Sequence, residues 1–212
     1  MEYIDKFLTF LFEQLLAPLW ATFDFVFAHL PLSALCILLG LGFCLPQMFG
    51  LKDPKRYASV ARKFARSAIT GRVLMVLATL WFIYYVRVES LSDFAKFKQY
   101  MMFGFLVIGI ATCFFVQDFL AVRGAAVLFL LLAKQMVDTG RPHLGQSSLV
   151  LVIQIWAYVL VLAGIWLTIT PWRLRDFVEW ATATERRIRL GCGIRLAFGL
   201  FIATLGLTEF RF

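Results

Sequence analysis

The chain has 212 residues, of which 61% are hydrophobic and only 16% are charged, and its formal net charge is +8. A soluble globular domain has about 45–50% apolar and about 25% charged residues, and a water-soluble core of this size cannot hide so much apolar surface. The composition therefore excludes an ordinary soluble fold and predicts an all-α membrane protein, a polytopic transmembrane helical bundle of about six spans.

The first thirty residues (1–30) are the ambiguous part of this pattern. Their apolar stretch, 7–29, is nearly long enough to cross a bilayer, but it contains Glu13, Pro18 and Asp24. A spanning helix here would also need a very tight reversal before the next apolar segment. We therefore expect residues 1–30 to form an aromatic-rich helix lying in the outer membrane interface, with a first spanning helix as the alternative.

The remaining residues, 31–212, are expected to form the bundle. About 20 residues are needed to cross roughly 30 Å of hydrocarbon, and helix starts carry their own signals. Thr170, which precedes Pro171, and Thr182, which stands three residues before Glu185, are expected to cap the helices that follow them. The predicted spans are 32–49, 68–86, 92–117, 121–137, 147–170 and 183–207.

The orientation follows from the lysines and arginines in the short loops. Residues 51–72 contain seven of them and residues 171–190 contain five, whereas 87–98 contain three and 138–146 contain one. Both rich loops fall on the same side of a six-span bundle. Because basic loops stay in the cytoplasm, the two rich loops are predicted to be cytoplasmic and the N-terminus to be outside.

Residues 51–72 also have the pattern of a basic amphipathic helix, and 171–181 repeat it over a shorter length. Apolar side chains recur on one face at helical spacing and basic ones occupy the other. No nucleic-acid-binding signature accompanies them, so anionic lipid head groups are the expected partner, and nucleic acid is not. The alternative is that these segments only fix the topology. The residues expected to bind anionic lipid are Lys55, Arg62, Lys63 and Arg66.

One short pattern resembles an enzyme motif. Lys134, followed after six residues by Arg141 and Pro142, is similar to the first signature of the type 2 phosphatidic acid phosphatase family, membrane enzymes in which a Lys and an Arg hold the substrate phosphate. That family also requires downstream histidines, one of them the nucleophile, and no histidine follows His143. We therefore expect no enzymatic activity, and expect Lys134 to pair with Asp138 four residues later.

Metal and cofactor sites are not indicated either. The four cysteines, at positions 36, 44, 113 and 192, have no CxxC spacing and lie in apolar segments, so free and buried thiols are expected. A haem held by two histidines would need imidazoles on facing spans, and the chain has only His29 and His143, both near the predicted outer surface. No cofactor is predicted.

The last predicted span carries a stripe of small residues. Gly199, Ala203 and Gly206 project within about 60° of one another on a helix, which lets a second helix approach closely. The stripe is predicted to be a helix contact, either within the bundle or with a partner subunit or a second copy of the chain.

Two classes of function follow. The first is a non-enzymatic accessory, assembly or scaffold subunit of a membrane complex, favoured by the small-residue stripe and the minimal loops. The second is a small transporter, channel or lipid-handling protein, favoured by a predicted outer polar cluster with Glu13 and Asp24 nearby. That cluster comprises Lys134, Asp138, Arg141 and His143.

The expected compartment rests on a resemblance. The run Arg175-Asp176-Phe177-x-Glu179-Trp180, which follows a Thr-Pro break, resembles segments of uncharacterised multi-pass proteins of bacterial inner membranes. The resemblance implies an integral protein of the bacterial inner membrane and implies no activity.

Overall fold

The computed structural model describes residues 2–28, 30–90 and 97–210, and within them it contains helices and no strand. Six of these helices are long and apolar enough to cross a membrane. They confirm the all-α fold class, and in length and composition they match the six predicted spans, although the predicted start of the third span, at residue 92, lies outside the described residues. The protein is an integral membrane protein. The spans are α3 (Leu32–Lys52), α5 (Ala68–Val88), α6 (Lys98–Phe115), α7 (Leu120–Gly140), α8 (Val150–Ile169) and α10 (Glu185–Thr208).

The N-terminal segment is two helical pieces rather than the one helix expected. Helix α1 (Glu2–Thr9) continues through π-helical turns at Phe10–Leu15, and α2 (Ala17–Phe23) continues through similar turns at Asp24–Ala28. The two pieces are bent by 52° at a break with Pro18 in the first turn of the second one, because proline lacks the N–H that would continue the hydrogen-bond ladder. By length and composition this bent pair also qualifies as a seventh span.

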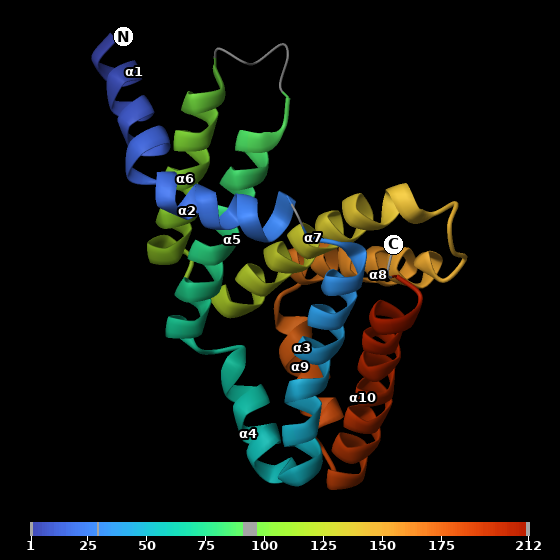
Figure 1. The fold of residues 1–212 in the computed structure, drawn as a ribbon. Helices are drawn as coiled ribbons and strands as arrows, with labels where there is room; N and C mark the ends of the chain where they lie inside the picture. Colours follow the sequence, from blue (N-terminus) through green and yellow to red (C-terminus); the bar gives the residue numbers. More distant parts are fainter. Residues whose placement is uncertain (1, 29, 91–96, 211–212) are drawn as a thin grey trace.

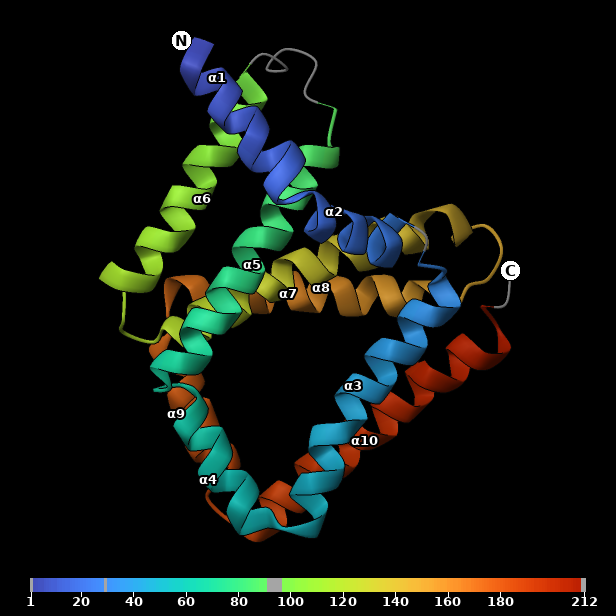
Figure 2. The same ribbon diagram turned by 60° about the vertical axis from the view of Figure 1, so that its left-hand side comes forward.

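The spans associate mainly in pairs. Helix α3 packs on α10, α7 packs on α8, and α5 lies between α6 and α7. Figures 1 and 2 show α7 and α8 running across the direction of α3 and α10. One apolar core joins α3, α7, α8 and α10, and a second core joins the N-terminal pieces to α5 and α6. The second core fixes the N-terminal segment on one end of the bundle.

The small-residue stripe of α10 packs against α3. A Cβ added at Gly199 would lie 2.6 Å from Cys44 Sγ, and one added at Gly206 would lie 2.7 Å from the backbone oxygen of Ser33. From the other side, a Cβ at Gly40 would lie 2.7 Å from the backbone nitrogen of Ala203. The two backbones are therefore as close as small residues allow, and van der Waals contact along this seam stabilises the pair where water cannot drive association.

Two short helices connect spans at the opposite end: α4 (Pro54–Phe64) and α9 (Trp172–Ala181). Figure 2 shows them together at the lower left, on the other side of the molecule from α2 and the end of α7. Following the predicted orientation, we call the end formed by α4 and α9 the inner end. The end formed by residues 2–28 and the C-terminal ends of α5 and α7 is the outer end.

Both predicted threonine caps are wrong. The helix α10 is capped by Thr184, whose hydroxyl accepts from the backbone N–H of Arg187 at 3.3 Å. The hydroxyl of Thr170 donates back to the carbonyl of Trp166 instead of capping α9. Thr182 is buried and takes part in a contact between helices described below. The Thr170 hydroxyl therefore bonds within its own helix and the Thr182 hydroxyl bonds to Arg62, so neither is available to cap the helix that follows.

Candidate functional site

Aromatic side chains join the N-terminal segment to the outer half of α5. The indole nitrogen of Trp20 donates to the backbone oxygen of Phe12 at 2.7 Å, which holds the two bent pieces together. The ring of Phe27 stacks on Trp81 with centroids 4.8 Å apart, and Tyr84 contacts Phe23 and Phe27. These rings form one wall of the outer end.

The first hollow at the outer end has a volume of about 390 Å³ and lies where Phe27 and residues 30–32 meet the ends of α5 and α7. We call it the Gln135 hollow. Gln135 is only 6% exposed, and its side chain accepts from the Tyr85 hydroxyl at 2.7 Å and donates to the backbone oxygen of Phe27 at 3.4 Å. It therefore ties α7 to α5 and to the N-terminal segment. The side chains lining the hollow include Phe27, Tyr84, Tyr85, Gln135, Asp138 and His143.

The second hollow, the Arg87 hollow, has a volume of about 400 Å³. The Asp24 carboxylate there accepts from the Tyr84 hydroxyl at 3.0 Å and lies 3.4 Å from the Arg87 guanidinium, which in turn sits 5.7 Å from the centroid of the Trp20 ring. Since Tyr84 lines the first hollow and Asp24 the second, their hydrogen bond lies between the two. The lining side chains are Glu13, Ala17, Trp20, Ala21, Asp24 and Arg87.

The predicted outer polar cluster is only partly assembled. Lys134 and Asp138 form the pair that their spacing predicts, at 2.7 Å, and Glu89 lies 3.9 Å from the same ammonium. Asp138 and His143 line the Gln135 hollow, whereas Arg141 is exposed in the turn after α7. The ammonium of Lys134 is thus held by carboxylates, which is the opposite of what a phosphate-binding lysine requires.

Asp138 and His143 of the predicted outer polar cluster line the Gln135 hollow, and Glu13 and Asp24 line the Arg87 hollow, but sequence reasoning missed the other polar residues of the two hollows. Gln135, Tyr84 and Tyr85 lie inside apolar spans, and Arg87 was counted only as a loop charge. The sequence signal for Gln135, Tyr84 and Tyr85 is a polar group within a span, because such a group must find a hydrogen-bond partner away from water. Glu13 and Asp24 were noticed as charges, but nothing in the sequence paired Asp24 with α5.

At the inner end the basic residues expected to bind lipid have different environments. Arg62 donates from Nε to the hydroxyl of Thr182 and from Nη2 to its backbone oxygen, both at 2.9 Å, and so joins α4 to α9. Lys55 lies 3.8 Å from Glu185. Lys63 and Arg66 are exposed. Of the four, Lys63 and Arg66 are therefore the best placed to meet lipid head groups.

Part of the apolar face of α4 packs within the protein, while Val60 on the same face is exposed. Tyr57 and Ala61 on α4 share with Phe177, Val178 and Ile188 a hollow of only about 50 Å³. Burial raises the pKa of the Tyr57 hydroxyl above its ordinary value, so this phenol stays uncharged. Tyr57 and Ala61 thus pack against α9 and the start of α10 and leave little space there, and the contact of the exposed part of α4 with the bilayer surface stays a prediction.

The four cysteines are free and buried, as expected from the sequence. Among the described residues no group of three or more His, Cys, Asp or Glu side chains could hold a metal ion. Comparisons of the chain with family models, with curated proteins and with solved structures give no match.

Proposed function

We propose that this integral membrane protein is non-enzymatic and binds a polar ligand, either a solute or a lipid head group, at its outer end. This is the transporter and lipid-handling class of function. The observation that carries the proposal is the pair of hollows, of about 390 and about 400 Å³, because ligand sites occupy about 300–1,000 Å³ and combine apolar walls with a few placed polar groups.

One of the two arguments for the accessory-subunit hypothesis does not hold for an outside partner. That hypothesis drew on the stripe of Gly199, Ala203 and Gly206 as a surface for another chain, and this stripe is covered by α3. The outer hollows, in contrast, leave charged side chains facing an open space that nothing in the described part of the chain fills. Support for binding is therefore stronger than support for a scaffold.

We further propose that the protein resides in a bacterial inner membrane with α4 and α9 in the cytoplasm against anionic lipid. The asymmetry of lysine and arginine between the loops supports this orientation. The exposed Lys63 and Arg66 on or next to α4 support the lipid contact, since each basic residue near an anionic surface contributes about 1 kcal/mol.

The binding proposal is tested on the purified protein in lipid nanodiscs. The melting temperature is measured with choline, glucose, glutamate and phosphate as probes, since a ligand at one hundred times its Kd stabilises the folded state by about 2.7 kcal/mol. We expect at least one probe to raise the melting temperature. The effect should disappear in Ala21→Trp, which fills the Arg87 hollow, and persist in Ala183→Trp, a matched change at the inner end.

Native mass spectrometry of the same sample tests the accessory-subunit hypothesis. If no probe shifts the melting temperature, no lipid is retained, and a second polypeptide is present in stoichiometric amount, the binding proposal is wrong and the accessory-subunit hypothesis replaces it.

A further inference from the structure

Arg195 is a charged residue inside a membrane span. It follows Glu185, the first residue of α10, by ten positions and so lies about 15 Å along the helix. A cation within a span needs a partner or an aqueous space. The Arg195 side chain is partly buried and turns toward the inner end, where its Nε donates to the backbone oxygen of Gly191 at 3.0 Å. No carboxylate in the described part of the chain forms an ion pair with it, so its charge is left unbalanced there.

Arg195 lines the small cavity between α4, α9 and the start of α10, whose volume is about 50 Å³. A water molecule needs about 10–15 Å³ of such space, whereas an organic ligand needs about 300 Å³ or more. The cavity therefore has room only for a monatomic or similarly small occupant. Tyr57, Thr182 and Arg195 supply its polar groups, and its other lining side chains are apolar, so no carboxylate faces the space.

The polar groups of this cavity suit an anion. Burial raises the pKa of the Tyr57 hydroxyl, against the effect of the Arg195 guanidinium beside it, so the phenol stays a hydrogen-bond donor. Thr182 is bound by Arg62, which brings a second guanidinium to the wall of the cavity. Two cations and a neutral donor, with no carboxylate among them, create a positive local potential that attracts an anion and repels a cation.

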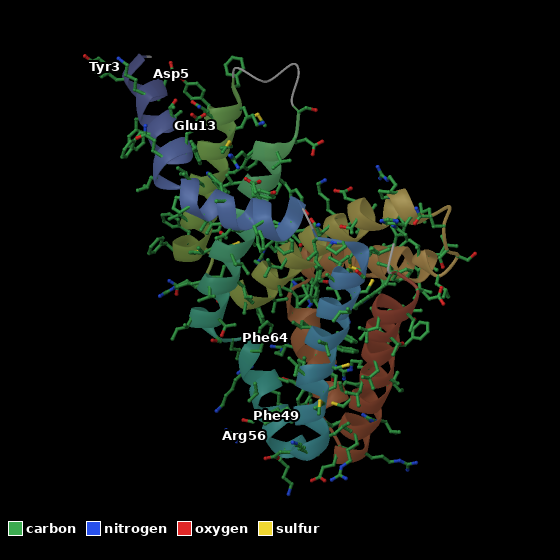
Figure 3. The ribbon with its side chains drawn as sticks, in the orientation of Figure 1. Tyr3, Asp5, Glu13, Phe49, Arg56 and Phe64 are labelled. Atoms are coloured by element: carbon green, nitrogen blue, oxygen red, sulfur yellow. The ribbon has the colours of Figure 1, made fainter. Side chains whose placement is uncertain are left out.

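We propose that this cavity binds a small inorganic anion, of about the size of chloride, on the guanidinium of Arg195 and the hydroxyl of Tyr57. The bound anion balances the charge of Arg195 within the span and joins α10 to α4. Figure 3 shows Phe49 of α3 and Arg56 of α4 at the opposite end of the molecule from Glu13. The anion site at the inner end is therefore separate from the outer hollows and does not depend on the function proposed for them.

The experiment uses the full chain in phosphatidylcholine nanodiscs and compares chloride with gluconate, an organic anion too large for the cavity, at constant sodium concentration. Binding is measured from the width of the chloride NMR line, and stability from the melting temperature. We expect chloride to show a broadened line and to raise the melting temperature, because a ligand that binds only the folded state stabilises it. Bromide should compete with chloride, and the larger sulfate should not. Arg195→Gln should weaken chloride binding about tenfold or more, because it removes a charged donor. Arg189→Gln, which removes the same charge from an exposed position of α10, should not weaken it.

A second pair of variants distinguishes loss of the anion site from loss of the fold. Ala61→Leu keeps Arg195 and fills the cavity, so chloride should neither bind nor raise its melting temperature. Ser59→Leu, at an exposed position of α4, should retain both effects.

Three results would overturn the proposal. If chloride and gluconate give the wild type the same melting temperature and the chloride line is not broadened, the cavity holds only water. If chloride binding survives in Arg195→Gln or in Ala61→Leu, the anion binds elsewhere on the molecule. If sulfate binds as tightly as chloride, the site is not this cavity, which is too small for it. Should Arg195→Gln fail to fold, the comparison of Ala61→Leu with Ser59→Leu decides the question alone.

Discussion

The inner and outer ends of the molecule are packed differently. At the inner end, Tyr57 and Ala61 of α4 meet side chains of α9 and leave a space of about 50 Å³. At the outer end, the N-terminal segment packs on α5 through aromatic rings but leaves hollows of about 390 and about 400 Å³ lined by charged groups. Arg62 ties the inner end together, and the charged hollows of the outer end are where we propose that a ligand binds.

The largest loss of stability is expected from a change at the seam between α3 and α10. Gly40→Ala should destabilise the protein by about 3 kcal/mol, the upper part of the range for overpacking. The added Cβ would lie 2.6 Å from the backbone oxygen of Gly199, and backbone cannot rotate away. Gly42→Ala, on the same helix with open space around it, should be neutral or slightly stabilising. Equal melting temperatures for the two variants would contradict the close seam.

A smaller loss of stability is expected from the inner end alone. Arg62→Ala removes two hydrogen bonds between α4 and α9 and should lower the free energy of unfolding by about 1–2 kcal/mol. Arg62→Lys should recover little of it, since an ammonium cannot reproduce the guanidinium's two parallel donors. Lys63→Ala, an exposed neighbour, should change stability by less than about 0.5 kcal/mol.

Arg62→Ala also tests whether the inner end affects ligand binding at the outer end. If the inner end serves stability only, ligand binding measured below the melting transition should be the same in Arg62→Ala as in the wild type. A large change in Kd would mean that the two ends are coupled.

At the outer end we expect Gln135→Leu to cost about 1 kcal/mol of stability and to loosen the N-terminal segment. The leucine keeps the apolar volume but removes the bonds to Tyr85 and to the backbone oxygen of Phe27. Hydrogen exchange of amides in Asp24–Ala28 should accelerate, while that in α4 should not. Gln117→Leu, an exposed position at the inner end of α6, is the control. Unchanged exchange at Asp24–Ala28 would show that the aromatic contacts alone hold this segment.

The smallest effect concerns the start of α10. Thr184→Ala removes the cap that accepts from Arg187 and should cost about 1 kcal/mol. Thr170→Ala should cost less than about 0.5 kcal/mol, because that hydroxyl only donates back to its own helix. Thermal melts of both variants check the order, and a larger loss for Thr170→Ala would reverse the assignment of the caps.

The sequence by itself determined the spans and the local pairs. A backbone in lipid must satisfy its hydrogen bonds internally, so long apolar runs become helices whatever surrounds them, and all six were predictable. The pair of Lys134 and Asp138 was predictable for a similar reason, since residues four apart on a helix are neighbours. The close approach at Gly199 could be expected from residue size, but not that α3 is the helix it meets.

Only the tertiary structure decided the site. Asp24 and Tyr84 stand 60 residues apart, Phe27 and Gln135 stand 108 apart, and Arg62 and Thr182 stand 120 apart. Periodicity within one helix says which face is apolar and nothing about which helix will cover it. Tyr57 and Ala61 on the apolar face of α4 meet α9, and the polar groups inside α5 and α7 meet an N-terminal segment bent at a proline. The hollows exist because these distant segments meet without filling the space between them, and no local pattern encodes such a space.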